Sequence, residues 1–280
     1  MSIEQKVPSD LISSQVKLAL AEDIGQQDLT ADLIPINTQA SATIITRENA
    51  TLCGEKWLNE VFKQLDPTIT IKWNFADGER MNADDIICQL QGPARTLLTG
   101  ERTAMNFMQT LSATATHAQR YADEVQGINV QILDTRKTLP GFRLAQKYAV
   151  RCGQCYNHRI GLFDGILIKE NHINAAGSIA KAIQQAGDLH PDIDVEIEVE
   201  NFAELEQALA ADADIIMLDN FDVADLIKAV AITKGKAKLE ASGGITLDNV
   251  RRIAETGVDR ISIGAITKDI QAIDLSMRFL

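Results

Sequence analysis

Short apolar runs alternate with amphipathic stretches along the chain from about residue 130 onward. The runs occupy residues 130–134, 165–169, 195–199, 215–219, 238–241 and 260–264. Helical patterns lie between them, at residues 178–187, 202–211, 223–233 and 246–256. This strand-then-helix order predicts a parallel sheet, and its even spacing favours a barrel over an open sheet. A complete eightfold barrel needs about 250 residues, so the shorter stretch available here predicts an incomplete α/β barrel. The pattern reveals six of its strands and does not locate a seventh.

The part of the chain before about residue 110 follows a different pattern. Helical periodicity at residues 13–21 precedes strand-like runs at 42–46, 69–73 and 86–89. The turn-forming pair Asp77-Gly78 separates the last two runs. A long helical stretch then extends from residue 99 to about residue 125. We therefore predict a separate α+β unit, joined to the barrel by this long helix.

The charge balance limits the classes of partner. The chain has 27 Lys and Arg against 39 Asp and Glu, a net charge of −12 at pH 7. Such a surface repels nucleic acid and anionic membranes, so an anionic ligand must be held by a local cluster of cations. The opening 30 residues mix acidic, basic and apolar side chains, which fits neither a signal peptide nor a transit peptide. We expect a cytoplasmic protein with neither a nucleic acid nor a membrane as partner.

The four cysteines do not form a zinc-binding or redox pattern. Only Cys152 and Cys155 are close in sequence, and neither a second pair nor histidines at metal spacing accompany them. We predict ordinary reduced thiols.

Polar residues follow every predicted strand of the barrel. In chain order they are DTRKT at 134–138, KENH at 169–172, EVEN at 198–201, DN at 219–220, EASGG at 240–244 and SIG at 262–264. Strand ends meet water and are often polar for that reason alone. However, catalytic groups of barrel enzymes lie at the carboxyl ends of the strands. The whole set therefore predicts a functional site at this end of the barrel.

The third run has acidic and apolar residues in strict alternation, as DVEIEVE at 194–200. In a barrel the valines and isoleucine would face the helices and the glutamates would face the lumen. Buried carboxylates need cations, for which Lys169, Arg136 and Lys137 are candidates, and a divalent ion with bound phosphates is another. An edge strand with a solvated acidic face is the alternative.

Two glycine-containing segments have the makings of a phosphate cradle. Ser242-Gly243-Gly244 lies between a strand and a helix predicted to open at Thr246, and Ser262-Ile263-Gly264 follows the next strand. Glycines let backbone N–H groups approach an anion, and a helix amino terminus adds favourable charge. The predicted phosphate-binding residues are Ser242, Gly243, Gly244, Ser262 and Gly264.

Cationic side chains from separate segments complement the carboxylates. They are Arg102, Arg136, Lys137, His158, Arg159 and Lys169. Arginine binds carboxylate and phosphate bidentately, and lysine serves as a point charge, so together they could hold a dicarboxylate and a pyrophosphate. A lone histidine is more often structural or on the surface, but His158 directly precedes Arg159 in a loop ahead of a strand, where a ligand contact fits the sequence equally well.

Six segments in this order closely resemble the signature segments of the quinolinate phosphoribosyltransferase family. They are GERTAMN at 100–106, DTRKT at 134–138, CYNHR at 155–159, IKENH at 168–172, EIEVE at 196–200 and EASGGI at 240–245. The likeness extends to LAEDIG at 20–25 and DLT at 28–30. It implies an N-terminal α/β sandwich domain over residues 1–112 and an incomplete, about seven-stranded α/β barrel over 113–269, with residues 270–280 packing back on the first domain. It also implies a homodimer with shared active sites.

The resemblance further implies a role for each candidate residue. Arg102 would reach into the partner subunit's site, while Arg136, His158, Arg159 and Lys169 would surround quinolinate. Lys137 would contact the pyrophosphate, and Glu198 and Asp219 would approach the ribose and its Mg²⁺. Ser242, Gly243 and Gly264 would hold the 5-phosphate. The implied catalytic set is Lys137, Lys169, Glu198 and Asp219, although Glu196 and Glu200 share the face of Glu198.

The implied reaction is that of a pentosyltransferase in NAD biosynthesis. The phosphoribosyl group of 5-phosphoribosyl 1-pyrophosphate would pass to quinolinate with decarboxylation, giving nicotinate mononucleotide, pyrophosphate and carbon dioxide. Loss of pyrophosphate leaves positive charge on the ribose carbon, so positioning and charge stabilisation are needed and a nucleophilic side chain is not. Two alternatives stay open from the sequence: a relative on the same scaffold with another acceptor, such as a molybdenum-associated paralogue, and a non-catalytic barrel that binds phosphate.

Overall fold

The computed structural model describes residues 7–280, which form two compact units. One unit comprises the chain up to Gln119 together with Leu144–Gln154 and Asp269–Leu280. The other comprises Arg120–Arg143 and Cys155–Lys268. The first unit thus extends past residue 112, and it takes in Leu144–Gln154 as well as the C-terminal segment.

The first unit contains a four-stranded antiparallel sheet in the order β12-β1-β5-β3. Its strands are β1 (Gln39–Thr46), β3 (Thr70–Trp73), β5 (Ile86–Pro93) and β12 (Leu275–Phe279), and β2 (Ala50–Thr51) pairs separately with β4 (Arg80–Met81). The C-terminal strand β12 pairs with β1, so the end of the chain belongs to this sheet. The helices are α1 (Ser9–Ile24), η1 (Ala31–Leu33), α2 (Glu55–Leu65) and most of α3 (Ala94–Glu124).

Asp77 organises the interior of the first unit. Its Oδ1 atom accepts hydrogen bonds from the backbone N–H groups of Gly54, at 2.9 Å, and Glu55, at 3.1 Å, and thereby caps the start of α2. Its Oδ2 atom accepts a hydrogen bond of 2.8 Å from Tyr148 on α4 (Arg143–Cys152). Gly153, which follows α4, lies so close to α3 that an added Cβ would collide with the carbonyl oxygen of Ala115. These contacts explain why most of α4 groups with the first unit.

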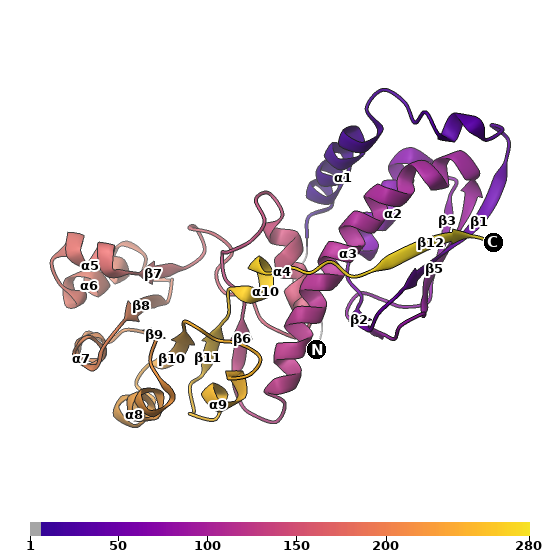
Figure 1. Cartoon of the computed structure of the whole chain (residues 1–280). Helices are drawn as coiled ribbons and strands as arrows, with labels where there is room; N and C mark the ends of the chain where they lie inside the picture. Colours follow the sequence, from indigo (N-terminus) through magenta and orange to yellow (C-terminus); the bar gives the residue numbers. More distant parts are fainter. Residues whose placement is uncertain (1–6) are drawn as a thin grey trace. The chain divides into compact units, whose positions relative to one another are not determined.

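The second unit contains a six-stranded parallel sheet in the order β6-β11-β10-β9-β8-β7. Its strands are β6 (Gln131–Leu133), β7 (Ile166–Ile168), β8 (Val195–Val199), β9 (Ile215–Asp219), β10 (Lys238–Ser242) and β11 (Arg260–Ser262). Helices α6 (Ile179–Leu189), α7 (Phe202–Ala210), α8 (Val223–Thr233) and α9 (Val250–Ala254) lie outside the arc of strands (Figure 1). The six predicted strands and the α/β fold class are confirmed.

The segment around Tyr156 extends this sheet beyond β6. Tyr156 forms a single parallel bridge with Leu133, with hydrogen bonds of 2.8 Å to the carbonyl of Ile132 and 3.1 Å from the N–H of Asp134. Nearby, His158 reaches Glu196 on β8, with 3.0 Å between Nε2 and Oε2. Because these two segments lie towards opposite ends of the strand order, the contact shows that the sheet curls around a lumen. The bridge occupies the place of a seventh strand, which is too short to give an apolar run.

The start of α9 differs from the sequence prediction. A helix was expected from residue 246, but residues 246–249 form a turn in which Asn249 Oδ1 accepts a hydrogen bond of 2.8 Å from the N–H of Thr246. The side-chain amide of Asn249 also donates to the carbonyl of Gly244, at 3.0 Å. Helices α4, α5 (Glu170–Ala176) and α10 (Ala265–Lys268) were not anticipated either. The helix predicted to open directly after the glycines is therefore displaced by several residues.

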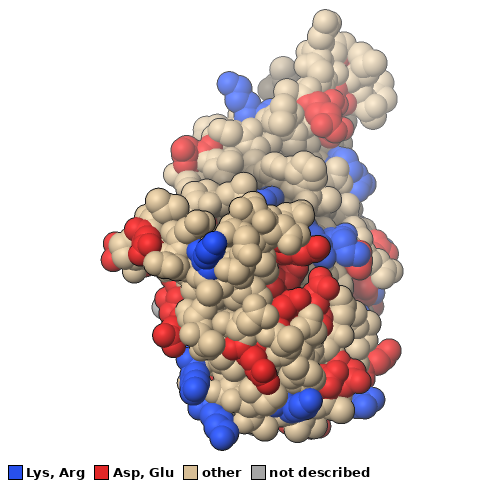
Figure 2. All heavy atoms as spheres, turned by 90° about the vertical axis from the view of Figure 1, so that its left-hand side faces the viewer, with Lys and Arg blue, Asp and Glu red and all other residues tan. Residues whose placement is uncertain are grey.

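The surface agrees with the acidic composition. On the face shown in Figure 2, acidic side chains form several groups, and basic side chains lie among them. Within residues 7–280, no helix is both long and apolar enough to span a membrane.

Candidate active site

All predicted site residues except Arg102 lie in the second unit, at or beyond the carboxyl ends of its strands. They are Arg136, Lys137, His158, Arg159, Lys169, Glu198, Asp219, Ser242, Gly243, Gly244, Ser262 and Gly264. Arg102 is exposed on α3 in the first unit.

Lys169, Glu198 and Asp219 form one charged group. The ammonium of Lys169, just after β7, makes an ion pair with Oε2 of Glu198 on the neighbouring strand β8. Partial burial and the negative charge of Glu198 raise the pKa of Asp219 at the end of β9, although Lys169, Ser242 and Lys137 act against them. Three adjacent strands thus bring two carboxylates and an ammonium together.

The three glutamates of the alternating strand have different surroundings. Glu196 is 4 % exposed and faces the lumen, as the alternation predicts. Glu198 lies nearer the carboxyl end of β8, beside Lys169. Glu200 lies beyond the strand and is exposed, and its backbone N–H donates to Glu204 at 2.9 Å. Of the three, Glu198 is the one that contacts Lys169, and its negative charge raises the pKa of Asp219.

His158 lies between two buried carboxylates at the base of the site. Its Nε2 atom is 3.0 Å from Glu196 Oε2 and 3.5 Å from Oε1 of Glu240, which is completely buried. Its Nδ1 atom accepts a hydrogen bond of 2.8 Å from the backbone N–H of Arg159. Burial lowers the pKa of His158, but the hydrogen bonds and charges of the two glutamates outweigh this effect and raise it to about 9. Burial also raises the pKa of Glu196.

The charges of this cluster indicate a protonated histidine between carboxylates rather than a metal centre. The three side chains bring potential ligand atoms within 4.8 Å of one another. However, the raised pKa of His158 keeps a proton on Nε2, which faces the two carboxylates, so this nitrogen offers no lone pair. A metal would need that lone pair. His158 and Glu196 therefore hold their protons to higher pH than the separate groups would.

The cysteines are confirmed as free thiols, and all four are buried. Cys152 lies near Cys53 and Asp77 in the first unit, with potential ligand atoms within 4.8 Å. Both carboxylate oxygens of Asp77 already accept hydrogen bonds, from the start of α2 and from Tyr148. Among the described residues, this group is therefore better explained by packing and capping than by a metal.

Two arginines lie close enough to influence each other. Burial lowers the pKa of Arg159, and the positive charge of Arg136 lowers it further. Arg159 also donates from Nη1 to the carbonyl of Gly165, at 3.0 Å. The Nε atom of Arg136 is buried and has no hydrogen-bond partner within the described part of the chain. Since buried donors normally have acceptors, this atom and the adjacent positive charges suit a polyanionic ligand.

Lys137 is held above the predicted phosphate cradle. Its N–H donates to Thr135 Oγ1 at 3.1 Å, and its carbonyl accepts from Thr267 Oγ1 at 2.9 Å. Its side chain runs across Gly264, where an added Cβ would lie 2.9 Å from Lys137 Cδ. Glycine at this position therefore lets the lysine reach past the end of β11.

The cradle itself is built from a loop. Gly243 has φ +94° and Gly244 has φ +60°, conformations that favour glycine. A Cβ on Gly243 would collide with Oδ1 of Asn220, which has φ +59°. The N–H of Asn220 donates to the carbonyl of Ser242 at 2.9 Å, and its side-chain amide donates to Asp219 at 2.8 Å. The loop after β9 thus supports both the carboxylate and the cradle.

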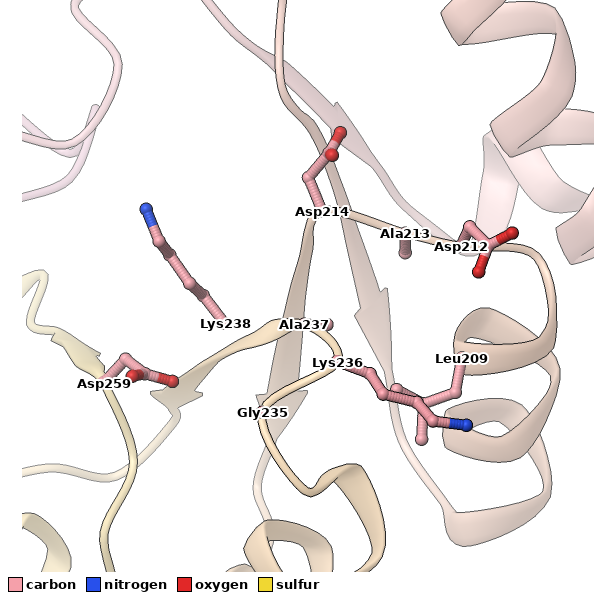
Figure 3. Close-up of a pocket in the computed structure, with 9 residues that line it drawn as sticks. All are labelled: Leu209, Asp212, Ala213, Asp214, Gly235, Lys236, Ala237, Lys238 and Asp259. Carbon is pink, nitrogen blue, oxygen red and sulfur yellow. The ribbon is translucent and has the colours of Figure 1, made fainter.

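A pocket of about 370 Å³ lies at the other end of the sheet (Figure 3). Its lining comes from segments that precede β9, β10 and β11: Leu209, Asp212, Ala213, Asp214, Gly235, Lys236, Ala237, Lys238 and Asp259. Asp214 and Asp259 accept backbone hydrogen bonds from Val195, at 2.7 Å, and Leu239, at 2.8 Å. These carboxylates therefore stabilise strand starts, and the pocket contains none of the predicted site residues.

Two family models together match nearly the whole chain. Residues 28–112 match the quinolinate phosphoribosyl transferase N-terminal domain, and residues 114–278 match the C-terminal domain of the same family. The chain belongs to the quinolinate phosphoribosyl transferase family.

Individual members of this family resemble this chain along nearly their full length. The nicotinate-nucleotide pyrophosphorylase structure from Francisella tularensis has 51% identity and a TM-score of 0.97, covering 100% of this chain and 99% of its own. A probable carboxylating nicotinate-nucleotide pyrophosphorylase of Bacillus subtilis is 40% identical over 260 residues, covering 91% of this chain and 89% of its own. The NadC structure from Streptococcus pyogenes has 36% identity and a TM-score of 0.94, covering 98% of this chain and 99% of its own.

Three residues around the candidate site had no role in the sequence predictions: Glu240, Asp134 and Arg143. Glu240 and Asp134 lie within recognised segments, but nothing in the sequence indicates that both are completely buried. Arg143 lies outside those segments, at the start of α4. Its contacts join loops that are distant in sequence, so no local pattern could have revealed them.

Proposed function

We propose that this protein transfers the phosphoribosyl group of 5-phosphoribosyl 1-pyrophosphate to quinolinate. The reaction releases carbon dioxide and pyrophosphate and forms nicotinate mononucleotide. The observation that carries this proposal is the match of both family domains, at residues 28–112 and 114–278. The cationic groups at the carboxyl end of the barrel fit the dicarboxylate substrate.

Quinolinate binds between Arg136, Arg159 and Lys169 in this proposal. The buried Nε atom of Arg136 and the adjacent charge of Arg159 support a bidentate contact with a carboxylate. His158 is the predicted contact with the least support, because both of its ring nitrogens already have partners in the protein. Its proposed place is the floor of the quinolinate pocket.

The phosphoribosyl donor occupies the opposite side of the same site. Its 5-phosphate lies on the cradle of Ser242, Gly243, Gly244, Ser262 and Gly264, and Lys137 extends over Gly264 towards the pyrophosphate. Glu198 and Asp219 lie beside the ribose. Their carboxylate oxygens are hard donors that Mg²⁺ prefers, and Mg²⁺ commonly binds one or two carboxylates together with substrate phosphates. When bound, Mg²⁺ would neutralise part of the negative charge on the pyrophosphate.

The residues of the chain act by positioning and by charge. Lys137 stabilises the departing pyrophosphate, and the carboxylates near the sugar stabilise the positive charge that develops on the ribose carbon. The ion pair with Glu198 fixes Lys169 beside the pyridine ring. Once its nitrogen is alkylated, the ring stabilises the carbanion formed as the adjacent carboxylate leaves as carbon dioxide, and this carbon then takes up a proton from water. Arg136 and Arg159 hold the other carboxylate in place.

The proposed active form is a homodimer. Arg102 lies on α3 in the first unit and is exposed, which is compatible with a contact to a neighbouring subunit. Its guanidinium would complete the dicarboxylate clamp in the neighbour's site. The four free, buried cysteines fit a reducing compartment, so we further propose that the enzyme acts in the cytoplasm.

Acceptor specificity tests the proposal. Purified protein is incubated with 5-phosphoribosyl 1-pyrophosphate, Mg²⁺ and carboxyl-labelled quinolinate, and labelled carbon dioxide is collected. A parallel reaction contains nicotinate, which lacks the second carboxylate. Donor-dependent release of carbon dioxide supports the proposal. Preference for nicotinate would indicate a relative with another acceptor, and donor binding without turnover would indicate a non-catalytic barrel.

A further inference from the structure

Arg143 connects the two loops that carry the proposed quinolinate contacts. Its Nε atom donates to Thr138 Oγ1 at 3.1 Å, and its Nη1 atom donates to the carbonyl of Ile160 at 3.2 Å. A longer contact of 3.5 Å joins Nη2 to the carbonyl of Arg136. The fork of one guanidinium thus holds residues 136 and 138 against residue 160.

Asp134 makes a second connection between the same loops. Its Oδ1 atom accepts a hydrogen bond of 3.0 Å from the N–H of His158, and its Oδ2 atom accepts one of 2.6 Å from Asn157 Nδ2. Asp134 is completely buried, whereas Arg143 is half-buried. The loop after β6 and the segment around Tyr156 are therefore joined at two points, and Arg143 provides the one that contacts the backbone of Arg136.

Lys137, between these residues in sequence, is held differently. Its backbone N–H bonds to Thr135 and its carbonyl bonds to Thr267 on α10, so neither polar group of its backbone depends on Arg143. The two cations of this loop consequently have separate supports. Arg143 supports the segment of Arg136, and Thr267 supports the segment of Lys137.

We propose that Arg143 is a positioning residue for quinolinate, which keeps Arg136 and Arg159 at the spacing that the dicarboxylate requires. The inference rests on the proposed function and deepens it. All three guanidinium nitrogens of Arg143 are directed at acceptors of the protein, so Arg143 acts through its neighbours. Its acceptors are two carbonyls and a hydroxyl in fixed positions, which a lysine cannot match because its ammonium lacks the planar fork.

Separate measurement of KM for quinolinate and KM for 5-phosphoribosyl 1-pyrophosphate tests this role. Arg143→Gln and Arg143→Lys should both raise KM for quinolinate by about tenfold or more, while KM for 5-phosphoribosyl 1-pyrophosphate stays within about twofold. Thr267→Val should show the opposite selectivity, because it loosens Lys137. Arg252→Gln is the matched control for lost charge: Arg252 is exposed on α9, and both KM values should stay as in the wild type.

Further variants address folding and provide a direct readout. Thr138→Val keeps the shape of the side chain but removes the acceptor for Arg143 Nε, so it should give a smaller rise of the same selectivity. For Arg143→Ala, added guanidinium ion should restore part of the quinolinate affinity, which a general loosening of the fold would not allow. Far-UV circular dichroism and thermal unfolding establish that each variant is folded.

The outcomes separate this inference from the proposed function. Unchanged quinolinate KM in a folded Arg143→Gln or Thr138→Val variant, with an active wild type, overturns the inference and leaves the proposed function standing. Equal losses for both substrates also overturn it, because they indicate general loosening. A wild type that does not convert quinolinate overturns the proposed function and the inference with it. If both Arg143 variants fail to fold, the selectivity of Thr138→Val decides the question.

Discussion

Lys169 and Glu198 form an ion pair between adjacent parallel strands, and this pair joins the two halves of the proposed site. In the proposed function, Lys169 contacts quinolinate and Glu198 lies beside the ribose. The side chain of Lys169 is 47% exposed and that of Glu198 is 17% exposed, so both can be reached by a ligand. The ion pair holds these two side chains beside each other, which in the proposed function sets their places before the substrates bind.

Replacement of Glu198 by glutamine should therefore reduce turnover strongly. The substitution keeps the size of the side chain, but it removes the charge that holds Lys169 and stabilises the ribose carbon. We expect kcat to fall by about 100-fold or more, with little change in thermal stability. Glu200→Gln is the matched control, because Glu200 is exposed beyond the same strand. Equal kinetics of the two variants would show that Glu198 has no special role.

The shared site can be tested by complementation. Arg102→Ala and Arg136→Ala should each be folded and nearly inactive, because each removes one clamp on the dicarboxylate. A mixture that exchanges subunits should recover part of the activity, since a mixed dimer has one site with both arginines and one with neither. Subunit exchange is checked with labelled protein. If exchange occurs and the mixture stays inactive, Arg102 acts within its own subunit.

Activity should depend on magnesium. Glu198 and Asp219 provide oxygen ligands, but two carboxylates cannot neutralise a departing pyrophosphate. Excess chelator should abolish release of carbon dioxide, and added Mg²⁺ should restore it. Calorimetric titration of the protein with pyrophosphate, with and without Mg²⁺, gives a second readout. Full activity in excess chelator would rule out this role.

The His158 cluster predicts a specific pH dependence of stability. The pKa of His158 is about 9 in the folded protein against 6.5 as a free side chain. Its contribution to stability is therefore fully present below pH 6.5 and is lost as pH rises through about 9. The raised pKa of Glu196 has the same sign, because a raised carboxyl pKa also favours the fold at lower pH.

Urea unfolding of wild type and His158→Gln, at several pH values between 6 and 10, measures this effect. The stability advantage of the wild type should shrink as pH rises across that range. Glu255→Gln serves as a control, because Glu255 is exposed at the end of α9. An advantage that is constant with pH would show that the cluster does not titrate as described.

Much of the barrel could be predicted from the sequence because its elements have strong local signals. Strands β8 and β9 and helix α8 have the predicted limits. Apolar residues alternate along β8, are continuous along β9 and recur at helical spacing along α8, in each case up to a polar end. The inward direction of Glu196 also followed from this alternation. By contrast, the bridge at Tyr156 involves a single residue and gives no periodic signal.

The features that the sequence did not reveal depend on contacts between distant residues or on side-chain competition. Helix α9 begins later than expected because Asn249 forms a turn with Thr246 and Gly244. The partners of His158 come from β8 and β10, and those of Arg143 come from two loops. Residue type alone indicated that His158 could have either a structural or a binding role. The structure shows its contacts with Glu196 and Glu240, and its contact with quinolinate stays a prediction.

The central claim concerns the reaction itself, and product stoichiometry tests it most directly. Wild-type protein is incubated with quinolinate, 5-phosphoribosyl 1-pyrophosphate and Mg²⁺, and three products are measured in the same sample. The account predicts equal amounts of nicotinate mononucleotide, pyrophosphate and carbon dioxide, all abolished in folded Arg136→Ala. Formation of a mononucleotide that retains both carboxylates, or consumption of the donor without a pyridine product, would contradict it.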